Sequence, residues 1–163
     1  MPKPLVVFDC VVFVQSLIKD SGPAARCLER FEQGRFSLAV SPQTLTELRD
    51  VLSRSSLRQD FPAITEEKVG RLMEVLLLKA MLFQRVPKRF AYPRDPDDEP
   101  YVNLAIEAGA QFLVTRDRDL LDLMRADTEE GRGFQRRFQE LKILDPVAFL
   151  EKIGQTSDEV VRE

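Results

Sequence analysis

The sequence contains no histidine and no tryptophan, and it has only two cysteines, Cys10 and Cys27. The absence of histidine excludes Ser-His-Asp and Cys-His catalysis, as well as any histidine-ligated metal. Two cysteines provide neither a disulfide framework nor the spacing of a zinc site, which favours a reducing cytoplasm. Catalysis in this chain would therefore depend on carboxylates, amines and hydroxyls.

Long hydrophobic runs and glycine-rich turns are also missing. No apolar run approaches the roughly 20 residues of a transmembrane helix, so we expect no contact with a membrane. The first apolar stretch is too short, and is followed too early by an acid, to be a secretory signal. No glycine-rich turn follows that stretch, which excludes a dinucleotide-binding fold.

The composition that remains is that of a globular protein, with 44% hydrophobic and 31% charged residues over 163 positions. This length fits one domain, which we place at residues 1–153, followed by a flexible polar tail over 154–163. The net charge of −3 gives no overall attraction to nucleic acid, so RNA binding would require a local basic patch. Arginine accounts for 17 of the 24 basic residues, and arginine pairs well with phosphate.

Predicted strands alternate with predicted helices along the chain. Apolar runs predict strands at 5–9, 36–40, 81–86, 111–115 and 142–144. Helical spacing and capping residues predict helices at 10–18, 23–31, 42–52, after Thr65, after Asp95 and after Pro146. In the helix after Thr65, the apolar residues that should face inward are Val69, Leu72, Met73, Leu76 and Leu77. We interpret 55–62 as a polar connection and 127–139 as a charged surface excursion. The alternation implies an α/β fold with a parallel, doubly wound sheet.

Acidic residues follow two of these strands. Asp9 ends the first strand, and Asp117 comes just after strand 111–115. Open parallel sheets usually place their functional sites at this carboxyl edge. The alternative for Asp117 is a cap on the short helical segment 119–123, and that alternative applies more strongly to Asp119.

Two further acids lie on predicted helices. Asp98 begins the row Asp98, Tyr101, Val102 and Ala105, so its side chain should point toward the apolar face, where a carboxylate must be paired or bind metal. Its neighbours Asp95 and Asp97 are explained as a helix cap and a dipole partner. Glu47 lies at the margin of the stripe formed by Leu45, Leu48 and Leu52, and its alternative is an ordinary surface contact.

Clustered carboxylates repel one another unless a cation lies between them. Oxygen ligands without histidine or cysteine favour Mg²⁺ or Mn²⁺ over zinc, and such sites hydrolyse phosphodiesters. A phosphatase of the haloacid-dehalogenase type would need a second aspartate two residues after Asp9, where this chain has Val11. We predict that a basic rim for a nucleic-acid backbone consists of Lys88, Arg89, Arg94, Arg116 and Arg118, with Arg132, Arg136 and Arg137 as the alternative location.

Four segments, 6–9, 46–52, 95–105 and 113–121, occur in the order found in a known family. Over roughly residues 4–150 the chain resembles the PIN-domain ribonucleases, especially the VapC-like toxin components of toxin–antitoxin pairs. The resemblance implies a single PIN-like domain with a five-stranded parallel sheet flanked by helices, an α/β/α sandwich. It also implies a metal-dependent endoribonuclease with one or two Mg²⁺ or Mn²⁺ ions, commonly a homodimer bound by an antitoxin protein.

Carried over to this sequence, the metal-binding and catalytic acids of the family are Asp9, Glu47, Asp98 and Asp117, with Asp119 as an auxiliary metal ligand. The chain departs from the family at Cys10 and Val11, where members usually have a small hydroxyl residue followed by Asn or Ser. This departure favours an alternative function, a catalytically weak PIN domain that acts as an RNA- or partner-binding module.

Overall fold

The structure is a computed structural model that describes the backbone of residues 3–162 and the side chains of residues 3–154. Its strands form one five-stranded sheet in the order β3-β2-β1-β4-β5, and every neighbouring pair is parallel. The predicted parallel α/β fold is confirmed. The strands are β1 (Leu5–Phe8), β2 (Ser37–Val40), β3 (Met81–Leu82), β4 (Phe112–Val114) and β5 (Lys142–Leu144).

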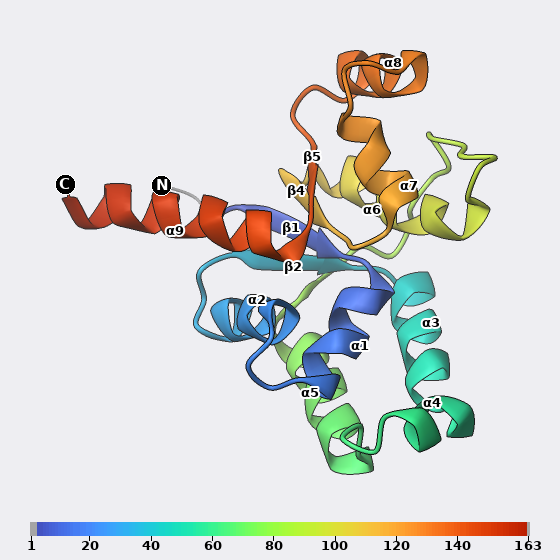
Figure 1. The fold of residues 1–163 in the computed structure, drawn as a ribbon, viewed down its shortest axis with the longest axis vertical. Helices are drawn as coiled ribbons and strands as arrows, with labels where there is room; N and C mark the ends of the chain where they lie inside the picture. Colours follow the sequence, from blue (N-terminus) through green and yellow to red (C-terminus); the bar gives the residue numbers. More distant parts are fainter. Residues whose placement is uncertain (1–2, 163) are drawn as a thin grey trace.

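Helices cover both sides of this sheet, with α1, α2 and α5 on one side and α6, α7 and α8 on the other (Figure 1). Those before β4 are α1 (Cys10–Ile18), α2 (Pro23–Glu32), α3 (Pro42–Leu52), α4 (Ser55–Asp60), α5 (Glu66–Lys79), the 3₁₀ helix η1 (Pro96–Asp98) and α6 (Glu99–Ala108). Those after β4 are α7 (Arg118–Leu121), the 3₁₀ helix η2 (Asp122–Met124), α8 (Glu129–Arg137) and α9 (Pro146–Arg162).

The central strand β1 is surrounded by aromatic side chains. The Phe8 ring lies 5.4 Å from the ring of Phe13 in α1, 5.8 Å from that of Phe36 and 6.1 Å from that of Phe149 in α9. Burial of each such side chain stabilises the fold by about 1.5–3 kcal/mol. The strand that ends in Asp9 is therefore held firmly on its packed face.

The strand order places a crevice at the carboxyl end of β1. The chain runs from β1 to β2 and β3 on one side, and then returns to β4 and β5 on the other side of β1. Ligands of open α/β sheets bind at such a change of direction. Phe8 pairs with Val114 across β1 and β4, so Asp9 and Thr115 come next to each other at this edge.

Some predicted element bounds are wrong. Residues 55–60 form the helix α4, and not only a polar connection, and the strand predicted over 81–86 pairs only at Met81–Leu82. Leu77 is 64% exposed, because it lies beyond the stripe of Leu72, Met73 and Leu76 that packs inward from α5.

The predicted surface excursion at 127–139 contains the helix α8. Thr128 caps this helix by accepting a hydrogen bond from the Gly131 N–H at 3.0 Å, and Phe134 is buried beside Phe90. This helix was not predicted from the sequence because it contains two glycines, and glycine lowers helix propensity. At Gly131 a Cβ atom would collide with the carbonyl oxygen of Arg125, so this position requires glycine.

In the part of the chain that the structure describes, no helix has the length and apolar character needed to cross a membrane. The predicted flexible tail at 154–163 falls mostly on residues whose side chains lie outside the described ones, and it stays a prediction.

Candidate metal centre

Two of the predicted acids are fixed by helix caps at the carboxyl edge of the sheet. Asp9 accepts a hydrogen bond from the Val11 N–H at 2.7 Å, which caps α1. Asp117 accepts one from the Asp119 N–H at 2.8 Å, which caps α7. The alternative interpretation of Asp117, as a helix cap, is therefore correct for its Oδ1 atom, which accepts this hydrogen bond. Each cap holds its carboxylate in a defined direction.

A buried threonine, whose role was not predicted from the sequence, joins these two acids. Thr115 has no exposed surface, and its hydroxyl donates to the second oxygen of Asp9 at 2.6 Å. The same hydroxyl accepts a hydrogen bond from the Asp117 N–H at 3.0 Å. The only signal in the sequence was a hydroxyl residue at the end of an apolar strand, two positions before an acid. Thr115 therefore sets the relative position of both carboxylates.

Asp98 lies where η1 meets α6 and is only 8% exposed, as its helical spacing predicted. Its Oδ2 atom is buried and has no hydrogen-bond partner among the described residues. The charges of Asp117, Asp95 and Asp9 all act on this carboxyl group. A buried carboxylate oxygen without a partner is costly, so the arrangement favours a proton or a cation at this point.

A fourth acid, Asp95, lies near the strand-end acids, although it was explained differently from the sequence. Carboxylate oxygens of Asp95, Asp117 and Asp119 all lie within 4.8 Å of one another, close enough to hold one cation. Asp95 was interpreted only as a helix cap, but its side chain makes no capping hydrogen bond. Its proximity to the strand-end acids depends on the loop before η1, which no periodic pattern in the sequence describes.

Glu47 lies on α3 at the margin of the acidic group and is partly buried. The Tyr101 hydroxyl donates to Glu47 Oε2 at 2.8 Å. Burial raises the pKa of Tyr101, so that hydroxyl stays a neutral donor. Glu47 also acts electrostatically on Asp9. Glu47 therefore faces the acidic group. The alternative considered from the sequence was an ordinary surface contact, and these interactions go beyond it.

Burial and mutual repulsion raise the pKa of the acids in the absence of a cation. Burial raises the pKa of Asp9, and the hydrogen bonds from Thr115 and Val11 oppose that effect. Burial, followed by the charge of Asp117 and by Asp95, raises the pKa of Asp98 to about 8. At neutral pH the metal-free chain thus keeps a proton on Asp98, and a cation that binds there would displace it.

The pKa of Asp98 predicts how the stability of the metal-free chain depends on pH. The folded chain holds the Asp98 proton up to about pH 8, whereas the unfolded chain releases it near 3.8. The free energy of unfolding should therefore fall as pH rises between these values, by up to about 1.4 kcal/mol per pH unit for this one group. Thermal unfolding in EDTA from pH 5 to 8 measures this decline, which Asp98→Asn should flatten. The exposed neighbour Asp97→Asn is the control, and equal slopes in all three proteins would contradict the prediction.

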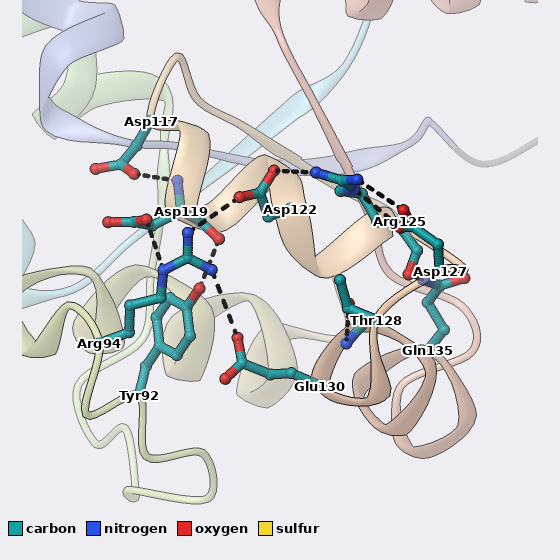
Figure 2. Close-up of polar contacts among 11 residues, drawn as sticks. Tyr92, Arg94, Asp117, Asp119, Asp122, Arg125, Asp127, Thr128, Glu130 and Gln135 are labelled. Atoms are coloured by element: carbon teal, nitrogen blue, oxygen red, sulfur yellow. Dashed lines mark hydrogen bonds and ion pairs between the residues drawn. The ribbon is translucent and has the colours of Figure 1, made fainter.

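One of the predicted RNA-binding residues, Arg94, forms ion pairs with three acidic side chains. Figure 2 shows the Arg94 guanidinium between Asp119, Asp122 and Glu130, at N–O distances of 2.8, 3.1 and 4.0 Å. The buried Tyr92 donates its hydroxyl to the Asp119 carbonyl oxygen at 2.7 Å. Arg94 therefore neutralises the auxiliary acid Asp119.

The other four predicted cations divide into two pairs. Lys88 and Arg89 form ion pairs with Glu99 at 3.2 Å and Glu107 at 2.8 Å. Arg116 and Arg118 are exposed, and neither forms an ion pair within the described residues. Arg116 and Arg118 are thus the cations of the predicted rim whose charge is not already balanced by a neighbouring carboxylate. The binding of RNA by all five residues remains a prediction.

The departure from the family at Cys10 and Val11 leaves Asp9 well held. A backbone N–H, that of Val11, and the Thr115 hydroxyl occupy its two oxygens, so no polar side chain at 10 or 11 is needed for this. Burial raises the pKa of the Cys10 thiol to about 12, which makes it a poor metal ligand. Val11 is 47% exposed and adds an apolar surface next to the acids.

The donor set fits a hard divalent cation. Asp95, Asp117 and Asp119 offer carboxylate oxygens within 4.8 Å of one another, and Asp9 and Asp98, which interact electrostatically with Asp117, are not in that close group. The sequence has no imidazole, and burial keeps the neighbouring Cys10 thiol from ionising readily. Such ligands favour Mg²⁺ or Mn²⁺ over zinc or copper. The partnerless Asp98 Oδ2 is the atom that a cation would satisfy.

Comparison with known families supports this chemistry. The chain matches the family described as PIN domain over residues 5–119, from β1 into α7. A comparison with curated proteins gave no match. PIN domains are generally metal-dependent nucleases that bind divalent cations through clustered acids, and the acidic group described above lies within the matched region. This chain belongs to the PIN-domain family.

Proposed function

We propose that this protein is a metal-dependent endoribonuclease that hydrolyses RNA phosphodiester bonds with Mg²⁺ or Mn²⁺. The observation that carries the proposal is the buried Asp98 carboxylate, whose Oδ2 has no partner and which faces the charges of Asp9 and Asp117. A group of acids that repel one another inside a fold is costly unless it serves a cation.

Each residue has a role that follows from its contacts. Asp9, Asp98 and Asp117 would hold the cation, and Glu47 would complete the site directly or through water. A bound Mg²⁺ or Mn²⁺ supplies an activated water and neutralises charge on the phosphate. Thr115 orients Asp9 and Asp117 through its hydroxyl, so that neither carboxylate must reorganise on binding. Asp95 is the acid that we add to the set, and Arg94 limits the contribution of Asp119.

The direct test is cleavage of tRNA, rRNA fragments and mRNA by the purified chain. We expect cleavage with Mn²⁺ or Mg²⁺ and its loss in EDTA, followed by recovery when the metal is returned in excess. Cleavage that continues unchanged in EDTA would rule out the metal-dependent mechanism. No cleavage of any RNA would favour the alternative function, an RNA- or partner-binding module, to which the apolar Cys10 and Val11 point.

We further propose that the protein is the toxin of a toxin–antitoxin pair in the cytoplasm. The resemblance to VapC-like toxins supports this role, and the two buried free cysteines suit a reducing compartment. A short reading frame with a DNA-binding pattern next to the gene would supply the antitoxin. Expression of the chain alone should arrest growth, and expression with that neighbour should restore it. Growth unaffected by the chain alone would contradict the toxin role.

A homodimer is also part of the proposal. Leu77, Leu78, Met81 and Leu82 are 48–76% exposed and lie next to one another, at the end of α5 and on the edge strand β3. An exposed apolar patch on a free strand edge is a common contact surface. Light scattering should give twice the 18.7 kDa mass of the chain, and Leu78→Asp should shift it to 18.7 kDa. The exposed Gln139→Asp is the control, and a monomeric wild type at micromolar concentration would contradict the dimer.

A further inference from the structure

A surface pocket of about 330 Å³ lies beside the metal centre, at the carboxyl ends of β4 and β5. It is lined by Arg116 and Arg118, which follow β4, by Asp145, which follows β5, and by the apolar side chains of Pro23, Leu121, Pro146 and Val147. The pocket therefore combines two cations, one carboxylate and an apolar wall. None of the metal-site acids lines it.

The two arginines are available to an external anion. The side chain of Arg118 makes no hydrogen bond or ion pair among the described residues, and the side chain of Arg116 makes one exposed hydrogen bond, to Gln15 Oε1 at 3.1 Å. They flank Asp117 in the chain, so a strand whose scissile phosphate lies at Asp117 would bring a neighbouring phosphate to them. Arginine holds phosphate through parallel N–H donors.

The remaining walls suit an unpaired base. Val147 is 52% exposed, and with Leu121 and Pro146 it offers an apolar surface against which a base can pack. Asp145 has one oxygen engaged in capping α9, since Oδ1 accepts from the Ala148 N–H at 2.8 Å. Its other oxygen can accept a hydrogen bond from an exocyclic amino group. Uracil has no exocyclic amino group, and at the position of the cytosine amino group it carries the O4 carbonyl oxygen, which the carboxylate would repel.

We propose that this pocket binds the nucleotide next to the scissile phosphate of a single-stranded RNA and prefers a base with an exocyclic amino group to uracil. Arg116 and Arg118 bind its phosphate, and Asp145 accepts a hydrogen bond from the exocyclic amino group of the base. The inference rests on the proposed function for the scissile phosphate, while the contacts to the neighbouring phosphate and base come from residues of the pocket itself and need no metal. Asp145, which would select the base, lies outside the matched region 5–119, whereas Arg116 and Arg118 lie within it.

Binding of two RNA pentamers, r(C)₅ and r(U)₅, tests the pocket without hydrolysis. Cytosine carries an exocyclic amino group, from which Asp145 would accept a hydrogen bond, whereas uracil carries none. Titration of the full chain in EDTA at low salt should give about tenfold tighter binding of r(C)₅, the ratio expected for one hydrogen bond to a charged group. Asp145→Asn keeps a helix-capping side chain and should abolish the preference. Arg118→Ala and Arg116→Ala should weaken both pentamers equally and lower the salt slope by about 0.7 for each phosphate that the variant no longer neutralises.

The exposed Arg71→Ala on α5 is the matched control and should bind both pentamers as the wild type does. Equal binding of r(C)₅ and r(U)₅, or variants at Arg118 and Asp145 that bind like the wild type, would contradict the pocket proposal. An equal loss in Arg71→Ala would also contradict it, because any surface arginine would then contribute. If the pocket variants bind like the wild type while RNA is still cleaved, the proposal for the pocket is wrong and the proposed nuclease function is supported. If the wild type prefers r(C)₅ but cleaves no RNA, base selection by the pocket is supported and the proposed nuclease function is wrong.

Discussion

Replacing Asp98 with asparagine is expected to lower the rate of RNA cleavage by about 100-fold or more, since even residues outside the ligand shell cost 10–100-fold when they are removed. Asparagine keeps the size of the side chain but removes the charge that would face the cation. Because it also removes a buried carboxylate with a partnerless oxygen, the variant should be as stable as the wild type, or more stable, at pH 8. A loss of cleavage in a protein that remains fully folded is therefore the expected result.

The measurement is the initial rate of RNA cleavage in Mn²⁺, with thermal unfolding recorded on the same samples. Asp97→Asn is the matched control, because Asp97 is the adjacent acid, lies in the same 3₁₀ helix and is exposed. It should cleave at close to the wild-type rate. An Asp98→Asn variant within about twofold of the wild type would remove Asp98 from the mechanism.

Replacing Thr115 with valine is expected to lower the affinity for Mn²⁺ by about 10–100-fold, the usual effect of losing a residue that orients metal ligands. Valine has nearly the same shape as threonine, so the packing of β4 should be preserved. The substitution removes the donor to Asp9 and the acceptor for the Asp117 N–H. We also expect a loss of about 1–3 kcal/mol in the free energy of unfolding, because one oxygen of the buried Asp9 carboxylate loses its hydrogen-bond donor.

Calorimetric titration with Mn²⁺ and urea unfolding of Thr115→Val measure these two effects. Thr115→Ser restores the hydroxyl and should recover most of the metal affinity, even if the lost methyl group lowers stability. If valine binds Mn²⁺ as tightly as threonine does, then Thr115 has only a structural role.

Strong periodic signals in the sequence were enough to predict where three of the acids lie in the fold. The row that starts at Asp98 placed its carboxylate inward, and the strand ends placed Asp9 and Asp117 at one edge. Both predictions depend on local geometry, in which a helix or strand fixes the direction of each side chain. A pattern of the same kind, apolar strands that alternate with helices, predicted the parallel sheet.

Other features depended on contacts between distant segments. The ion pairs of Arg94 were not predicted, because one of its partners, Glu130, lies on α8, a helix that its glycines made hard to predict. Asp95 precedes a proline and resembles an ordinary cap, and only the folded loop brings it near Asp117. Thr115 showed no pattern of its own, because a single buried hydroxyl does not interrupt an apolar strand.

The most direct test of the proposed metal centre is anomalous scattering from crystals of the protein soaked in Mn²⁺. We predict an anomalous peak between the carboxylates of Asp9, Asp98 and Asp117, and its loss in crystals of Asp98→Asn. A saturating soak that gives no peak at these carboxylates, or a peak only at acids elsewhere on the chain, would contradict the assignment of this acidic group as the metal site of a nuclease.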